Sequence, residues 1–213
     1  MRIIYQKGEA EITEKKSRFI GELLPAASEE AAAAAVDAAR KRYYDARHHC
    51  FAYRIGGPAV TVRMSDDGEP AGTAGKPIAE VLSREGLIDC VAVVTRYFGG
   101  TLLGTGGLFR AYEEAAKAAL DAAVVLERLE GRNVTVSCDY ALWGKIQYRA
   151  AEKNLTLLDT AYGAEVTAKL LCPEDAVQAL TAELTDLSAG RARIAIGKTA
   201  AAYGVRDGKV ILL

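Results

Sequence analysis

The spacing of hydrophobic and polar residues divides the first half of the chain into strands and helices. A period of two predicts one hairpin over residues 9–24 and a second over residues 48–64, which turns at Gly56. Between these hairpins, an alanine-rich run from Ser28 to about Arg42 predicts a helix, because alanine favours helices and serine caps them well.

The apolar run from Val91 to Val94 does not alternate, which predicts a central strand buried on both faces. A glycine-rich loop follows, and the residues from Leu108 to about Ala123 predict a helix. A strand that leads through such a loop into a helix is typical of anion sites, because free N–H groups and the helix dipole face the loop. The candidate binding residues here are Arg96, Tyr97, Gly99, Gly100, Gly104, Gly106, Gly107 and Arg110.

The same glycines also have a purely structural interpretation. Glycine fits tight turns and lets a helix approach a sheet closely, and the spacing does not distinguish this role from anion binding. The segment matches neither the P-loop pattern nor the dinucleotide-binding pattern, so no nucleotide motif with known mechanics applies.

An acidic, glycine-rich loop spans residues 65–77 and leads into a predicted helix over residues 78–84. Its carboxylates would hold a hydrated Mg²⁺ ion or act as general acid and base. The alternative is an ordinary turn, because aspartate and glycine are what turns require. The candidate binding residues of this loop are Asp66, Asp67, Glu69 and Lys76.

The second half of the chain has a simpler pattern. We expect a domain boundary within residues 124–132, where the long helix ends and Gly131 interrupts the pattern, and we assign domains to residues 1–128 and 129–213. Beyond the boundary the expected order is strand, helix, strand, strand, helix, strand, which is the ferredoxin-like βαββαβ order. The ranges are 134–138, 140–154, 155–161, 165–171, 173–185 and 191–199.

Composition and charge narrow the function classes. The chain has 213 residues and a net charge of -1, so no overall field attracts it to nucleic acid or to acidic membranes. The four cysteines are widely spaced, which indicates a reduced, cytoplasmic protein with buried thiols. We expect no membrane span, no cofactor and no metal site, because the only histidines, His48 and His49, lack further ligands nearby in the sequence.

Four sequence blocks resemble the YigZ/IMPACT family in order: KKSRFIGEL, HHCFAYRIG, SDDGEPAGTAGKP and VVTRYFGGTLLGTGGLFRAY. The resemblance covers roughly residues 10–125 and is specific, because separate blocks match in sequence. It implies an α+β protein of two domains. The first would have the βαβ fold of a small-subunit ribosomal protein, elongation factor G and GHMP kinases. The second would be similar to a ferredoxin-like domain of elongation factor G.

The resemblance also implies a translation-linked regulatory role, and three functions remain open. The first is binding of RNA, the ribosome or another phosphate-bearing ligand through the glycine-rich cleft. The second is a small-molecule enzyme, such as a hydrolase, that uses the three loop carboxylates. The third is an adaptor for a translation-associated protein. We favour the first and expect the acidic loop, Lys76, Arg96 and the Gly104–Gly107 segment to converge on one cleft. The alternative is that Arg96 pairs with Asp66 or Asp67 and braces two loops.

Overall fold

The computed structural model describes residues 1–56, 59–206 and 209–212. Its internal contacts divide the chain into two compact units, Met1–Glu127 and Arg128–Leu213. The division falls inside one long strand, β7 (Val124–Cys138). Each unit is described by itself below.

The first unit contains a five-stranded antiparallel sheet in the order β2-β3-β6-β4-β5. Its strands are β2 (Gly8–Glu14), β3 (Ser17–Pro25), β4 (His48–Ile55), β5 (Thr61–Ser65) and β6 (Cys90–Tyr97). A short first strand, β1 (Arg2–Gln6), pairs instead with the beginning of β7.

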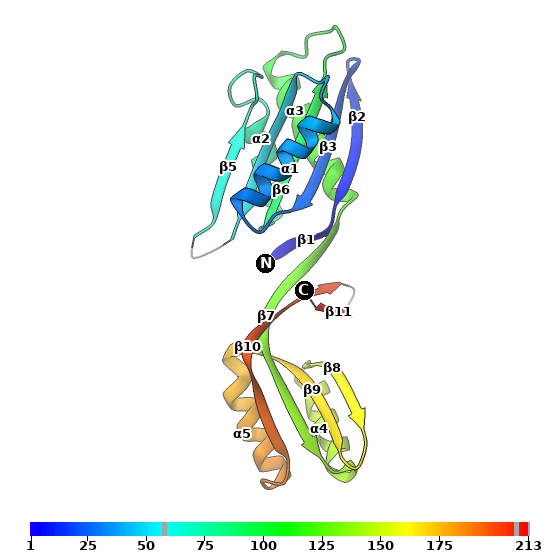
Figure 1. The fold of residues 1–213 in the computed structure, drawn as a ribbon, viewed down its shortest axis with the longest axis vertical. Coiled ribbons are helices and arrows are strands. Elements are labelled where there is room, and N and C mark those ends of the chain that lie inside the picture. Colours follow the sequence, from blue (N-terminus) through cyan, green and yellow to red (C-terminus); the bar gives the residue numbers. More distant parts are fainter. Residues whose placement is uncertain (57–58, 207–208, 213) are drawn as a thin grey trace. The chain divides into compact units, whose positions relative to one another are not determined.

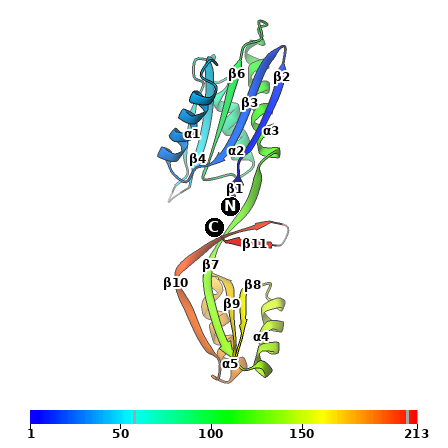
Figure 2. The same ribbon diagram turned by 45° about the vertical axis from the view of Figure 1, so that its right-hand side comes forward.

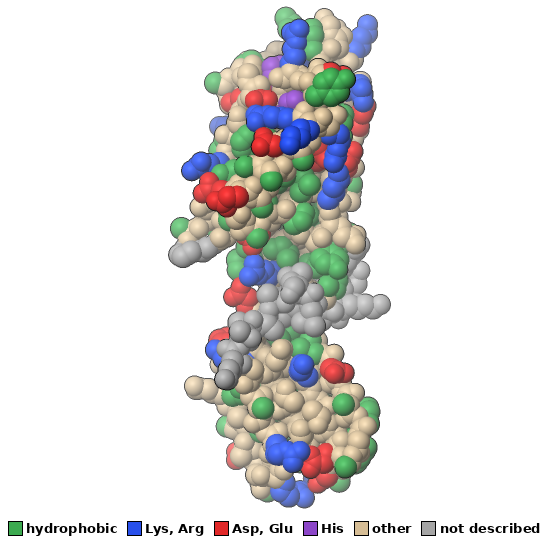
Figure 3. All heavy atoms as spheres, viewed as in Figure 1, with side chains coloured by type: hydrophobic (Ala, Val, Ile, Leu, Met, Phe, Trp, Pro, Cys, Tyr) green, Lys and Arg blue, Asp and Glu red, His purple; other side chains and the backbone are tan. Residues whose placement is uncertain are grey.

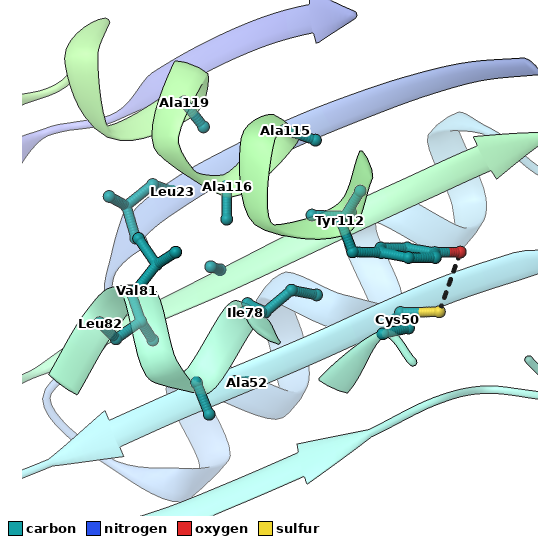
Figure 4. Packing of buried hydrophobic residues seen from close by; sticks show 14 of the residues in the cluster. Leu23, Cys50, Ala52, Ile78, Val81, Leu82, Tyr112, Ala115, Ala116 and Ala119 are labelled. Carbon is teal, nitrogen blue, oxygen red and sulfur yellow. Dashed lines mark hydrogen bonds between the residues drawn. The ribbon is translucent and has the colours of Figure 1, made fainter. Parts of the chain in front are cut away.

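Helices cover both faces of this sheet. α1 (Glu29–Arg42) packs on one face, and α2 (Gly75–Arg84) and α3 (Gly104–Asp121) pack on the other (Figures 1 and 2). The central strand β6 therefore serves two cores. Val91 and Val93 join the cluster beneath α1, while Ala92 and Val94 join the larger cluster beneath α2 and α3 (Figure 4). The prediction of a strand buried on both faces is confirmed.

One end of the sheet collects four connections. β3 and β4 begin there, and β5 and β6 end there, because neighbouring strands are antiparallel. The turn at residues 15–16 and the loops 43–47, 66–74 and 98–103 therefore lie at the same end, where α2 and α3 also begin. This end holds the acidic loop and the glycine-rich segment that the sequence singled out.

The second unit is a helix-backed sheet in the strand order β11-β10-β7-β9-β8. Without β11, the order along the sheet is fourth, first, third, second, which is the predicted ferredoxin-like arrangement. Side chains of α4 and α5 share one core with β7 and β9. The elements after β7 are α4 (Tyr140–Glu152), β8 (Thr156–Tyr162), β9 (Val166–Pro173), the short 3-10 helix η1 (Glu174–Ala176), α5 (Val177–Ser188), β10 (Arg193–Arg206) and β11 (Lys209–Leu212).

The division between the two units falls after Glu127, within the expected boundary region, although residues 124–132 form no break in the chain's secondary structure. They are part of β7, which pairs with β1 at its start and, from Gly131 onward, with β9. One local expectation was wrong. α3 begins at Gly104, so the last three glycines of the glycine-rich segment form its first turn instead of a loop. Among the described residues, no helix is long and apolar enough to span a membrane.

Candidate functional site

A cavity of about 430 Å³ opens at the loop-rich end of the first unit. Its walls come from the end of the α1–β4 loop, the acidic loop, residues 98–103 and the first turns of α3. Its lining includes the polar side chains of Arg47, His48, Glu69, Arg96 and Thr105, and the exposed apolar side chains of Phe98 and Leu102. Figure 3 shows the histidine side chains at this end of the unit, beside basic and acidic groups.

A buried ion pair forms the floor of the cavity. Arg96 is 6% exposed, and its Nη1 donates to Oε1 of Glu69 at 2.7 Å. Its Nη2 donates to Ser17 Oγ at 3.3 Å, while its buried Nε has no hydrogen-bond partner among the described residues. The guanidinium lies 5.3 Å from the ring centre of Phe19 and 5.5 Å from that of Phe98. Such flanking rings hold an arginine in place through cation–π attraction.

One neutral donor, the Tyr112 hydroxyl, supports Glu69 from the core. Tyr112 donates its hydroxyl to Glu69 Oε1 at 2.8 Å, and the Cys50 thiol donates to the Tyr112 oxygen at 3.3 Å (Figure 4). Burial, followed by the neighbouring Cys50 and Glu69, raises the pKa of Tyr112. Burial raises the pKa of Cys50 to about 12, so its thiol stays protonated at neutral pH. A protonated thiol is a poor nucleophile, so Cys50 acts as packing and as a donor.

The two aspartates of the acidic loop hold the backbone. Asp66 accepts from the N–H groups of Gly72, Ala74 and Gly75 at 2.8, 2.9 and 2.8 Å, which caps the start of α2. Desolvation alone would raise the pKa of Asp66, but the three N–H donors together lower it. Asp67 accepts from the His49 N–H at 2.7 Å and from Arg40 at 3.1 Å.

These partners limit the chemistry of the loop. The carboxylates of Asp66, Asp67 and Glu69 each accept hydrogen bonds from protein donors, and both donors to Glu69 reach the same oxygen, Oε1. Within the described part of the chain, no group of three His, Cys, Asp or Glu side chains could hold a metal ion. All four cysteines are free and buried.

The N-terminus of α3 lies in the cavity wall. Gly104 and Thr105 line the cavity, and Gly104 has a φ of 69°, a conformation that favours glycine. The N-cap residue Leu103 offers no side-chain hydrogen bond, and the first turn contains no acidic residue. The first four N–H groups of a helix have no intrahelical acceptor, so these donors and the positive end of the dipole favour an anion here.

The structure brings together only part of the predicted site. Glu69, Arg96 and Gly104 line the cavity. Asp66 and Asp67 are not in its lining and instead accept hydrogen bonds from backbone N–H groups. The alternative that Arg96 forms an ion pair with the acidic loop is confirmed, but its partner is Glu69 instead of Asp66 or Asp67. The convergence of all candidates on one cleft stays a prediction, and this cavity holds three of them.

The remaining candidates point elsewhere. Lys76 is exposed on α2 and lies 4.0 Å from Glu80. Tyr97 donates its hydroxyl to Asp45 at 2.7 Å. Arg110 lines a separate hollow of about 170 Å³. It is six residues after Gly104 in α3, and at 3.6 residues per turn the two residues lie on different faces of the helix. The other four candidate glycines are not part of the cavity lining: Gly99, Gly100, Gly106 and Gly107.

Sequence analysis missed part of the cavity lining. Arg47 and His48 sit where the α1–β4 loop enters β4, and Phe98 and Leu102 lie in the loop between β6 and α3. The signal for Phe98 was available, because a large aromatic residue directly before two glycines is unusual for a turn. No local pattern marks Arg47, which makes no ion pair within the described residues and reaches the cavity only through the fold.

Comparisons with known proteins agree with this architecture. The profile of the Impact N-terminal domain matches residues 15–120, and a domain of unknown function, DUF1949, matches residues 136–191. The IMPACT family member YvyE of Bacillus subtilis is 38% identical over 195 residues, which cover 92% of this chain and 90% of the relative. The chain belongs to the IMPACT family.

One further IMPACT family relative and two solved structures are similar to this chain. YigZ of Escherichia coli is 39% identical over 178 residues, which cover 83% of this chain and 87% of the relative. A crystal structure described only as that of a hypothetical protein covers 93% of this chain and 98% of its own, at 36% identity and a TM-score of 0.60. The two-domain translational regulator Yih1 covers 56% of this chain and 48% of its own, at 26% identity and a TM-score of 0.39.

Proposed function

We propose that this IMPACT family protein is a cytoplasmic, translation-linked regulator that binds single-stranded RNA through the cavity of its first unit. Family membership supports the link to translation, since the resemblance to the family implies such a role. The observation that carries the RNA proposal is the uncapped N-terminus of α3, which shares one cavity with two arginines.

The charges of the cavity suit a phosphate group. Glu69 lies in this cavity, but Arg96 binds its carboxylate at 2.7 Å and offsets its charge. Arg47 and the N–H groups at the start of α3 then leave the cavity with excess positive potential. A phosphate oxygen that accepts from such donors makes charge-assisted hydrogen bonds, each worth about 1.5–3 kcal/mol.

The apolar side of the cavity suits an unpaired base. Phe98 is 52% exposed and Leu102 is 82% exposed, an unusual degree of exposure for large hydrophobic side chains. An aromatic ring beside a phosphate-binding group is how proteins bind single-stranded nucleic acid, with bases stacked on the ring. The protein as a whole carries a net charge of -1, so binding has to come from this local arrangement.

The test uses the exposed Thr105, which lies in the first turn of α3. Thr105→Glu places a carboxylate among the N–H donors, where it stabilises the helix by about 0.3–1 kcal/mol and repels a phosphate. Thr105→Gln is the matched neutral control. Fluorescence anisotropy with labelled single-stranded RNA oligomers should show about tenfold or greater weakening for Thr105→Glu and little change for Thr105→Gln.

A salt series completes this test. Each lost phosphate contact on a single strand should reduce the slope of log affinity against log salt concentration by about 0.7. We expect that reduction for Arg47→Ala, and no reduction for Arg63→Ala, an exposed arginine remote from the cavity lining. Equal RNA affinity in wild type, Thr105→Glu and Arg47→Ala would overturn the proposal.

A further inference from the structure

The outer edge of the first sheet is unprotected. β5 pairs with β4 on one side and with no other described strand, so its outward N–H and C=O groups face solvent. Edge strands normally carry lysine, proline or a bulge that prevents pairing with another chain. β5 has the sequence TVRMS, with no lysine, proline or register shift. Its single charged residue, Arg63, is held by Glu29 at 3.3 Å.

An apolar stripe runs along the same edge. Val60, Val62 and Met64 alternate along the chain and are 47%, 41% and 49% exposed. Met64 pairs with Ala52, a member of the core beneath α2 and α3, so the stripe lies on that face of the sheet. Residues that alternate on an exposed edge present one continuous surface to an added strand.

On the opposite face, an acidic groove borders β5. This groove of about 450 Å³ lies between α1 and the strands β4 and β5, and the parallel rings of Phe51 and Tyr53 form part of its wall. Figure 3 shows acidic and basic groups beside hydrophobic ones on this face of the unit.

The charges of the groove are unbalanced. Its lining carries the carboxylates of Glu29, Glu30 and Asp37. Of its two guanidiniums, that of Arg63 binds Glu29, while that of Arg40 lies 3.7 Å from Asp37 and 3.1 Å from Asp67, a carboxylate outside the lining. The lining therefore carries three carboxylates and two guanidiniums. Glu30 makes no ion pair among the described residues, so a positive charge on a partner would be attracted there.

We propose that β5 is a docking edge for an extended segment of a partner protein in which apolar residues alternate with lysine or arginine. Addition of a strand directs alternate side chains to opposite faces of the sheet. Apolar side chains of the segment would cover Val62 and Met64, and its basic side chains would reach the groove beside Glu30. This surface is separate from the RNA cavity lining, so the inference does not rest on the proposed function.

The probe is a labelled, end-blocked heptapeptide of alternating lysine and valine, with a glutamate–valine peptide of the same length as control. The full chain should bind the basic peptide and not the acidic one. Val62→Lys charges the apolar stripe and should weaken binding by about tenfold or more. The matched control is Leu157→Lys, which alters a side chain of the same 41% exposure on β8, an edge strand of the other sheet.

Two further readouts keep the proposal falsifiable. Glu30→Gln removes one groove charge without touching the strand and should weaken basic-peptide binding several-fold, while hydrogen exchange of residues 61–65 should slow when the basic peptide is bound. Equal binding of both peptides, or unchanged affinity in Val62→Lys, would overturn the proposal. Concentration-dependent self-association that Val62→Lys abolishes would also overturn it, because a second copy would then occupy the edge.

Discussion

Glu69 Oε1 accepts hydrogen bonds from both Arg96 Nη1, at 2.7 Å, and the Tyr112 hydroxyl, at 2.8 Å. One carboxylate oxygen thus connects the cavity floor, the acidic loop and α3. The Glu69 and Arg96 side chains are 4% and 6% exposed. If one of the two were removed, water could therefore not solvate the remaining buried charge. The pair therefore sets the position of the only strongly buried cation that lines the cavity among the described residues.

Breaking this pair should be costly. Arg96→Leu leaves a buried carboxylate without its cation, and the free energy of unfolding should fall by about 3–5 kcal/mol. Glu69→Gln combined with Arg96→Leu should cost less than the sum of the single changes, because no charge is left unpaired. Urea unfolding of the four proteins measures this coupling. Additive losses of the free energy of unfolding would show that the two side chains do not stabilise the fold as a pair.

Arg96 is also tested by RNA binding. Unchanged RNA affinity in Arg96→Ala would show that Arg96 stabilises the loops and does not contact RNA.

Phe98 should matter more for RNA binding than for stability. Its ring is 52% exposed, and its main described contact is the Arg96 guanidinium at 5.5 Å, so Phe98→Ala should lower the free energy of unfolding by about 0.5–1 kcal/mol. Loss of one stacked base should weaken RNA binding by about 1–3 kcal/mol. Tyr148→Ala is the control, because that ring is 70% exposed in the second unit. Equal RNA affinity for both variants would remove Phe98 from the site.

The buried thiols predict a loss of stability at alkaline pH. Burial raises the pKa of Cys50 and of Cys90 from 9.0 to about 12, so above pH 9 the unfolded chain releases protons that the folded chain keeps. The contribution of each thiol is constant below that pH and then falls by about 1.4 kcal/mol per pH unit until pH 12. Urea unfolding between pH 8 and about pH 10.5 should show this decline, and Cys50→Ser should make it shallower. Equal slopes in both proteins would contradict the assignment.

Gly99 should tolerate a side chain less well than Gly100. A Cβ at Gly99 would lie 2.0 Å from the backbone carbon of Lys16, whereas one at Gly100 would meet nothing within 4 Å. Gly99→Ala should therefore cost about 2–3 kcal/mol through overpacking. Gly100→Ala should cost about 1 kcal/mol, because its φ of 83° is unfavourable for alanine. Thermal unfolding ranks the two, and the reverse order would refute this account of the loop.

The pattern of hydrophobic and polar residues along the chain was enough to predict most helices and strands of the fold. Val91–Val94 indicated a doubly buried strand, and the element order of the second half indicated its ferredoxin-like sheet. It failed at Gly104, where glycines that usually mark a loop form the first turn of α3. At residues 124–132 it located the region where the two units divide but not the strand that crosses it, since a charged stretch with a glycine is compatible with a continuous strand.

The site was less predictable because it depends on long-range packing. Residue type marked Glu69 and Arg96 as candidates, but their pairing depends on contacts 27 residues apart in sequence. Lys76 and Arg110 were included because of their charge, and helix geometry directs them elsewhere. The acidic loop and the glycine-rich segment do lie at the same end of the sheet, as expected, although its strands are antiparallel.

Backbone amide resonances of residues 104–107, at the N-terminus of α3, test the central claim most directly. RNA phosphate bound there should shift these resonances in a titration of the labelled protein with a single-stranded RNA oligomer. Amides at the N-terminus of α2, which Asp66 already caps, should move little. Large, saturable shifts at Gly104 and Thr105 are the predicted result. RNA-induced shifts confined to other surfaces, or no shifts at all, would contradict the account.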